Sequence, residues 1–293
     1  MTTSPSQTTT GAAHAKATTM TQTLNPPLKW HGGKTYLADR LIALFPPHIH
    51  YVEPFFGGGA VLLAKNPVGA SEVVNDLNGD LINFWRVLAD PVLFPMFLRT
   101  AQATPCSEEL FVEAQRVGRG GEAVCRAINF LILCRQSRAA TFKDFTTLAK
   151  TRTRRNMNEL PSAWWNAIDG LPEVHARLSR VVILNRPAVE CLRTQDGKDT
   201  LFYCDPPYMH ETRSTPDVYQ HEMSRQDHEE FLDACLACKG YVVISGYDCD
   251  LYRERLAKWQ RYAFELPNNA AGGDSKRRMT EVVWCNYAAG GVR

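Results

Sequence analysis

Long hydrophobic runs are missing from this 293-residue sequence. None approaches the roughly 18 apolar residues that a membrane-spanning helix needs, and the first residues lack the charged and apolar regions of a secretory signal. We therefore expect a cytoplasmic protein with no membrane partner. Hydrophobic residues still make up 44% of the chain, which is enough to bury a sizeable core.

Cysteine is too sparse for a disulfide scaffold, since nine cysteines, an odd number, are scattered from Cys106 to Cys285. Reduced thiols are therefore expected. Cys235 and Cys238 form a C-x-x-C pair inside an apolar helical pattern, whereas a zinc site usually needs a second close pair. The sequence has no second pair, so we predict that both are core residues and that no metal binds.

A complete phosphate-binding loop is also missing. Gly33, Lys34 and Thr35 look like the end of such a loop, but the pattern requires a glycine five residues before Gly33. That position is Leu28, so an ATPase is not indicated. Another function must explain a Gly-Gly turn next to a tryptophan and a lysine.

Basic residues are concentrated in one segment of an otherwise acidic chain. Seven lie between Arg135 and Arg155 against one acid, a net charge of +6. Because the whole chain carries +2, the other residues sum to −4, which is +2 minus +6. A localised basic segment suggests a polyanionic partner. The candidate contacts are Arg135, Arg138, Lys143, Arg152, Arg154 and Arg155.

The alternation of strand and helix patterns predicts a doubly wound α/β sheet built from two pieces of sequence. Residues 1–25 are rich in Thr, Ser and Ala and are expected to be a disordered tail. Residues 26–97 form the first piece, residues 98–175 a mainly helical insert, and residues 176–293 the second piece. The last two predicted strands form a hairpin, which requires one antiparallel strand.

Two features at predicted strand ends indicate a nucleotide-like ligand. The turn from Gly57 to Gly59 follows the first strand, and glycines there let the backbone turn tightly and approach a ligand. Asp76 ends the next strand, about 20 residues further on, where an acid can accept hydrogen bonds from ribose hydroxyls. This spacing suits a cofactor that contains adenosine, although Asp76 could also serve only to start a helix.

The sequence Asp205-Pro206-Pro207-Tyr208 ends a third apolar strand. Two prolines restrict the backbone and make a rigid exit loop. Such a loop places a carboxylate, a proline carbonyl and an aromatic face at the edge of the sheet. The carboxylate of Asp205 and the carbonyl of Pro206 can accept hydrogen bonds from an exocyclic amine, while Tyr208 can stack on a planar base.

The combination of DPPY with VEPFFGGG, NDLN and KWHGGK resembles the Dam-type class of DNA adenine methyltransferases, which use S-adenosylmethionine. The resemblance covers residues 26–97 and 176–293 and matches the order of the family's motifs. Between them, the insert looks more like that of phage-type members. The family implies a Rossmann-like methyltransferase sheet with an inserted target-recognition domain, in a bacterium or a phage-infected host.

The resemblance also implies residue roles. Trp30 and Lys34 would contact the cofactor, Phe55 would lie near its purine, Gly57 and Gly59 would form the cofactor turn, and Asp76 would bind the ribose. Asp205 would lie close to both cofactor and target amine, with Pro206 and Tyr208 beside it. The expected reaction is direct, in-line methylation of the 6-amino group of an adenine flipped out of duplex DNA.

Three alternatives remain open at this point. The same chemistry could act on an adenine of RNA or on the amide of a protein glutamine. The third alternative is a DNA-binding module with an inactive site. The argument against it is that the motif residues are intact: Asp76, Asp205, Tyr208 and Lys34. The recognition sequence is not indicated, nor whether a restriction endonuclease acts beside the protein.

Overall fold

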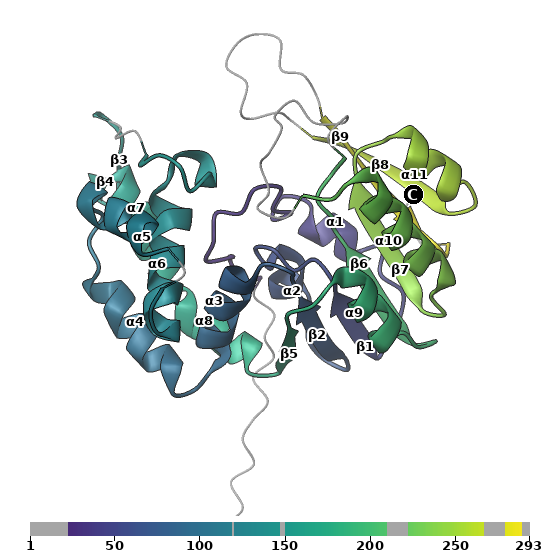
Figure 1. Ribbon diagram of the computed structural model, residues 1–293, viewed down its shortest axis with the longest axis horizontal. Helices are drawn as coiled ribbons and strands as arrows, with labels where there is room; N and C mark the ends of the chain where they lie inside the picture. The colour runs from purple at the N-terminus through teal and green to yellow at the C-terminus, as the bar shows by residue number, and fades with distance from the viewer. Residues whose placement is uncertain (1–22, 119, 147–149, 210–221, 267–278, 289–293) are drawn as a thin grey trace, which may run out of the picture.

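The computed structural model describes residues 23–118, 120–146, 150–209, 222–266 and 279–288. Figure 1 shows a sheet with flanking helices, and a group of helices from the middle of the chain beside it. The predicted tail falls mostly outside the described residues. Its last residues are attached to the sheet domain, because the backbone N–H of Leu24 donates to the carbonyl of Leu63 at 3.3 Å.

A seven-stranded sheet in the order β5-β2-β1-β6-β7-β9-β8 forms the centre of the molecule. Its strands are β1 His50–Glu53, β2 Ser71–Asn75, β5 Val181–Leu184, β6 Thr200–Cys204, β7 Tyr241–Gly246, β8 Gln260–Leu266 and β9 Met279–Cys285. The strands from β5 to β7 pair in parallel, whereas β9 is antiparallel to both β7 and β8. The predicted α/β sheet with its one antiparallel strand is confirmed.

The two faces of the sheet bury separate apolar layers, as expected for parallel strands covered on both sides. On β6, Leu201 and Tyr203 belong to one layer, and Phe202 and Cys204 belong to the other. Helix α1 Ala38–Ile42 precedes β1. The helices that follow strands of the sheet are α2 Ala60–Ala64, α3 Gly79–Ala89, α9 Ala188–Gln195, α10 Arg225–Ala237 and α11 Asp250–Arg255. Of the two cysteines predicted to be core residues, Cys235 is buried, whereas Cys238 is only partly buried and packs against the same apolar layer.

The middle of the chain is mainly helical, as predicted. It contains α4 Leu93–Ala103, α5 Glu108–Val117, α6 Ala123–Gln136, the 3-10 helix η1 Arg138–Ala140, α7 Glu159–Asp169, α8 Leu171–Leu178 and the two-residue strands β3 Thr153–Arg154 and β4 Met157–Asn158. Helix α6 packs on α3 and thereby joins this group to the sheet domain. The predicted insert boundaries, 97/98 and 175/176, fall inside α4 and α8. No change of composition marks either helix start.

Among the described residues, no single helix is long and apolar enough to cross a membrane. Helices α3 and α4 satisfy the length and composition criterion only as a pair, and they are bent by 105° relative to each other.

A buried ion pair fastens α8 to the sheet. Arg177 donates from Nη1 to Oε2 of Glu72 at 2.5 Å and from Nη2 to Oε1 at 2.8 Å, and both side chains are 1% exposed. Nη2 also donates to the carbonyl of Leu62 at 3.1 Å. Lys65 lies 3.3 Å from the same carboxylate. Desolvated charges of this kind are costly when one partner is removed.

We expect Arg177→Met to lower the free energy of unfolding by about 3–5 kcal/mol, because it leaves Glu72 with one cation in a buried site. Urea unfolding followed by circular dichroism measures this loss. The matched control is Arg186→Met, which breaks the exposed Arg186–Glu190 pair at 3.2 Å. That change should cost less than about 1 kcal/mol. Equal losses in the two variants would contradict a special contribution of the buried pair.

Candidate active site

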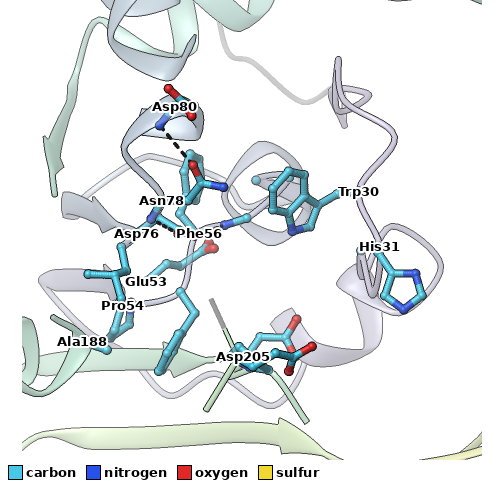
Figure 2. A pocket seen from close by; sticks show the side chains of 18 of the residues that line it. Trp30, His31, Glu53, Pro54, Phe56, Asp76, Asn78, Asp80, Ala188 and Asp205 are labelled. Carbon is cyan, nitrogen blue, oxygen red and sulfur yellow. Dashed lines mark hydrogen bonds between the residues drawn. The ribbon is translucent and has the colours of Figure 1, made fainter. Parts of the chain in front are cut away.

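A cavity of about 850 Å³ lies at the carboxyl ends of β1, β2 and β6, and residues of α6 also line it. Figure 2 shows Glu53, Asp76 and Asp205 around this cavity. The chain segments after these three strands supply Glu53, Asp76 and Asp205 to its wall. From the helical insert, Arg126, Asn129, Phe130, Leu133, Phe142 and Lys143 line the opposite side. The topology therefore brings together the strand-end residues singled out in the sequence.

The Gly-rich turn forms the floor of the cavity. Gly57 and Gly59 have φ angles of 50° and 73°, in the left-handed region that favours glycine. The backbone N–H of Gly57 donates to Oδ2 of Asp76 at 3.0 Å, and its carbonyl accepts from Nε1 of Trp85 at 3.0 Å. The turn is thus held from both sides while its bare backbone faces the cavity.

Trp30 lies against this turn and explains why its residues lack side chains. A Cβ on Gly57 would lie 2.6 Å from Nε1 of Trp30, and one on Gly58 would lie 2.7 Å from the Cβ of Trp30. The turn that follows Trp30 is closed by a hydrogen bond from the N–H of Gly33 to the carbonyl of Trp30, at 3.1 Å. The two glycine-rich segments therefore pack on each other through one indole.

Asp76 lines the cavity and also connects two loops. Its Oδ2 accepts from Gly57, and its Oδ1 accepts from the N–H of Asn78 at 2.9 Å. Asn78 in turn caps α3 by accepting from the N–H groups of Asp80 and Leu81. An ionised carboxylate can accept about four hydrogen bonds, so Asp76 combines a structural role with a place in the cavity wall.

Lys34 and Asp205 form a nearly buried ion pair beside the cavity. Nζ of Lys34 donates to Oδ2 of Asp205 and to the carbonyl of Gly32, both at 2.7 Å. The side chain of Lys34 is 3% exposed, and that of Asp205 is 20% exposed. Burial alone would lower the pKa of Lys34, but the carboxylates of Asp205 and Glu281 raise it above its ordinary value. Lys34 is therefore a cation that holds Asp205.

Glu281, in β9, joins this group and was not singled out from the sequence. Its Oε1 lies 3.4 Å from Nζ of Lys34 and accepts a hydrogen bond from the hydroxyl of Tyr208. The residue is 1% exposed. Burial raises the pKa of Glu281 above its ordinary value, and Lys34 offsets this only in part. The signal in the sequence that could have identified Glu281 is an acidic residue inside an apolar strand.

Glu53 belongs to the VEPFFGGG motif, but no role was predicted for its side chain. It ends β1, lines the cavity and is 2% exposed. Its Oε1 accepts a hydrogen bond from the hydroxyl of Tyr51 at 2.8 Å. Burial raises the pKa of Glu53 to about 8. Burial thus favours the neutral form of this carboxyl, and a cation in the cavity would favour its ionised form.

The rest of the DPPY segment is less accessible than its predicted role requires. Pro206 and Tyr208 are not among the described residues that line the cavity, whereas Pro207 is. The Tyr208 ring is 7% exposed and packs edge-on against Tyr247, with 4.5 Å between ring centroids. Stacking of Tyr208 on a base stays a prediction.

The predicted basic contacts divide into two groups. Arg135 is partly buried and donates to the carbonyls of Ala163 at 2.5 Å and Pro27 at 3.4 Å, so it links α6, α7 and the N-terminal segment. The other candidates are exposed: Arg138, Lys143, Arg152, Arg154 and Arg155. Arg152 and Arg154 lie 3.9 Å and 3.6 Å from Glu159, and Arg155 lies 3.0 Å from Asp169. Exposed pairs of this kind are weak and can exchange for phosphates.

Nothing in the described part of the chain gathers three or more His, Cys, Asp or Glu side chains as a metal site would. The same cavity does fit an adenosine-type cofactor. It has a backbone cradle that a Cβ would fill, the carboxylate of Asp76 in its wall and aromatic walls at Phe55 and Phe231.

Comparison with known proteins identifies a family. The sequence profile described as "D12 class N6 adenine-specific DNA methyltransferase" matches residues 30–268. The chain is 27% identical to the type II methyltransferase M1.LlaDCHI of Lactococcus lactis over 284 residues, covering 90% of this chain and 96% of the relative. It is 28% identical to the DNA adenine methylase of Haemophilus influenzae over 62% of this chain and 63% of that protein. It is 22% identical to the DNA adenine methylase of Escherichia coli K12 over 90% and 96%.

The contact between Trp30 and the Gly-rich turn can be tested at Gly58. We expect Gly58→Ala to lower the free energy of unfolding by about 1–3 kcal/mol, as overpacking does, because Trp30 must move. Urea unfolding measures this, and calorimetry should show weaker binding of S-adenosylmethionine. Gly79→Ala is the control, since its Cβ would meet only Oδ1 of Asn185 at 3.7 Å. Equal stability and equal affinity for S-adenosylmethionine in the two variants would contradict the role assigned to the contact between Trp30 and the Gly-rich turn.

Proposed function

This chain belongs to the D12 class N6 adenine-specific DNA methyltransferase family, and we propose that its cavity binds S-adenosylmethionine together with one adenine of its DNA substrate. The observation that carries this proposal is the position of Asp205 at the carboxyl end of β6, on the wall shared with the Gly-rich turn. Ligands of open α/β sheets bind at this edge.

For the cofactor, the adenosine part would lie against the turn from Gly57 to Gly59, with Asp76 accepting hydrogen bonds from the ribose hydroxyls. Phe55 provides an apolar surface for the purine. Trp30 covers the turn and excludes water from it. When bound, S-adenosylmethionine supplies a methyl group that its sulfonium has already activated, so the protein's main task is alignment.

Asp205 would receive the target amine. An adenine amine is a poor nucleophile because its lone pair is delocalised into the ring. Accepting its hydrogens at the Asp205 carboxylate and the Pro206 carbonyl favours a more pyramidal nitrogen whose lone pair points at the methyl group. Lys34 orients Asp205 through the 2.7 Å ion pair, and we assign it this role besides contact with the cofactor. Tyr208 would support the base or its acceptor.

The target base must leave the helix to reach this cavity, since the cavity wall is formed by both the sheet and the insert. Flipping costs a few kcal/mol, which contacts with the flanking DNA must offset. The exposed basic residues of the insert would supply phosphate contacts: Arg138, Lys143, Arg152, Arg154 and Arg155. Arg135 would instead stabilise the junction between the insert and the N-terminal segment.

An RNA adenine or a protein glutamine amide could use the same acceptor groups, and an inactive module could bind DNA without methylating it. Family membership favours DNA. Incubating the protein with labelled cofactor and DNA, RNA or protein separates these substrates. We also propose, from the bacterial relatives, that the protein acts in the bacterial cytoplasm. Sequencing of methylated sites in a producing host would identify the recognition sequence and any restriction partner.

Asp205 provides the central test. Asp205→Asn keeps the size of the side chain but can present an N–H donor to the target amine, and hydrogen bonds to charged groups contribute about 1.5–3 kcal/mol. We therefore expect single-turnover methylation to fall at least about tenfold to a hundredfold, and further in Asp205→Ala. DNA affinity should change much less, because phosphate contacts dominate it.

The matched control is Asp199→Asn. Asp199 precedes β6 at the opposite end of the same strand, and its side chain is 53% exposed. This variant should methylate like the wild type. If Asp205→Ala also stays within about twofold of the wild type, the proposed mechanism is wrong.

The basic segment is tested by the triple variant Arg152→Ala, Arg154→Ala, Arg155→Ala. Each lost phosphate contact should flatten the dependence of log affinity on log salt by about 0.9 for duplex DNA. Fluorescence anisotropy at several salt concentrations measures the slope. The control triple is Arg180→Ala, Lys198→Ala, Lys239→Ala, three exposed residues before β5, β6 and β7 at the far edge of the sheet. Matching slopes would favour a merely solvated basic surface.

A further inference from the structure

Glu281 is a buried acid whose place in the fold calls for a role. It lies in β9, pairs in register with Phe264 of β8 and is 1% exposed. Desolvating a carboxylate costs free energy, so buried acidic residues are uncommon unless partners stabilise them. Its contacts are the ammonium of Lys34 and the hydroxyl of Tyr208, and both of these groups also touch Asp205.

The hydroxyl of Tyr208 has one proton and two carboxylates within reach. It lies 3.1 Å from Oδ1 of Asp205, which is long for an O–H···O hydrogen bond. The same oxygen of Asp205 already accepts from the hydroxyl of Ser245 at 2.8 Å. Glu281 is the second acceptor. When Glu281 takes the proton, Oδ1 of Asp205 accepts from Ser245 and keeps the lone pair for which Tyr208 would compete.

We infer that Glu281 is a positioning residue for methyl transfer, which keeps the Tyr208 proton away from Asp205 so that Asp205 can accept from the target amine. This inference rests on the function proposed above. Glu281 also shares the charge of Lys34, so that this ammonium does not bind Asp205 alone. Without Glu281, the Tyr208 hydroxyl would turn to Asp205 and compete with the substrate.

The charge of Glu281 depends on its surroundings. Lys34 and Tyr36 face it from the N-terminal segment, Asp205 and Tyr208 from the loop after β6, and Tyr247 from the end of β7. A protonated Glu281 can no longer accept from Tyr208 through that proton-bearing oxygen, and its own O–H would need an acceptor. Methyl transfer should therefore slow as the pH falls through the raised pKa of Glu281.

The decisive experiment is a double-mutant cycle with full-length protein, measured as single-turnover methylation of duplex DNA. We expect Glu281→Ala to reduce the rate at least about tenfold, because one competing hydrogen bond at the reacting centre is worth about a decade. Tyr208→Phe should reduce the rate less, since it removes the competing proton but also an ordered contact. The double variant should be faster than Glu281→Ala alone and no slower than Tyr208→Phe.

A merely structural role gives the opposite result, since two packing defects in one cluster slow the enzyme together. A double variant slower than Glu281→Ala would therefore overturn the inference. The wild type and Asp205→Ala are run in parallel. If Asp205→Ala is as fast as the wild type, the proposed function fails; if it is inactive and the rescue is absent, only the role of Glu281 fails.

Should Glu281→Ala fail to fold, Glu281→Gln tests the same point through its pH profile. This variant keeps one acceptor oxygen but has no carboxyl to titrate, so the acidic limb of the rate profile should move to lower pH. Glu265→Gln, at an exposed carboxyl on the neighbouring strand, is the control and should keep the wild-type profile. An unchanged acidic limb in Glu281→Gln would overturn the inference.

Discussion

The site depends on the desolvated ammonium of Lys34. A lysine that is 3% exposed is tolerated only when partners replace its water. Here the carbonyl of Gly32 and the carboxylates of Asp205 and Glu281 do so, at 2.7, 2.7 and 3.4 Å. These partners come from the N-terminal turn, the loop after β6 and β9. One cation therefore holds three separate pieces of the chain around the cavity, and the Gly-Gly turn that resembled a phosphate loop shapes this attachment.

Most of the fold could be predicted because its signals are local. Parallel strands buried on both faces are short apolar runs, and each is followed by a helix pattern, as in β6 and α10. The boundaries of the insert could not be predicted as well. Only residues 90–92 separate α3 from α4, so no linker marks the change of region. Packing of α6 on α3 is a tertiary contact that composition does not reveal.

Within the site, the predictable residues are those that the topology positions. Asp76 and Asp205 follow strand ends, so they had to meet at one edge of the sheet. The partners of Glu281, in contrast, depend on the pairing of β9 between β7 and β8. The spacing of residues in the sequence does not predict this pairing. Arg135 shows how tertiary contacts can change the setting of a predicted residue. Its charge belongs to a basic segment, but the last turn of α6 directs it toward backbone carbonyls.

Helix α6 connects the lining of the cavity to the basic segment. Helix α6 supplies Arg126, which lies 3.0 Å from Asp80 at the start of α3, and Phe130, whose ring centroid is 6.3 Å from that of Trp30. The same helix leads directly into the basic segment. A movement of the insert relative to the sheet would therefore also move the part of the cavity lining that α6 supplies. A ligand can shift such an equilibrium only through its differential affinity for the two arrangements. In the binding mode proposed above, S-adenosylmethionine and DNA both contact the surroundings of α6, so we expect each to change the affinity of the other by the same factor.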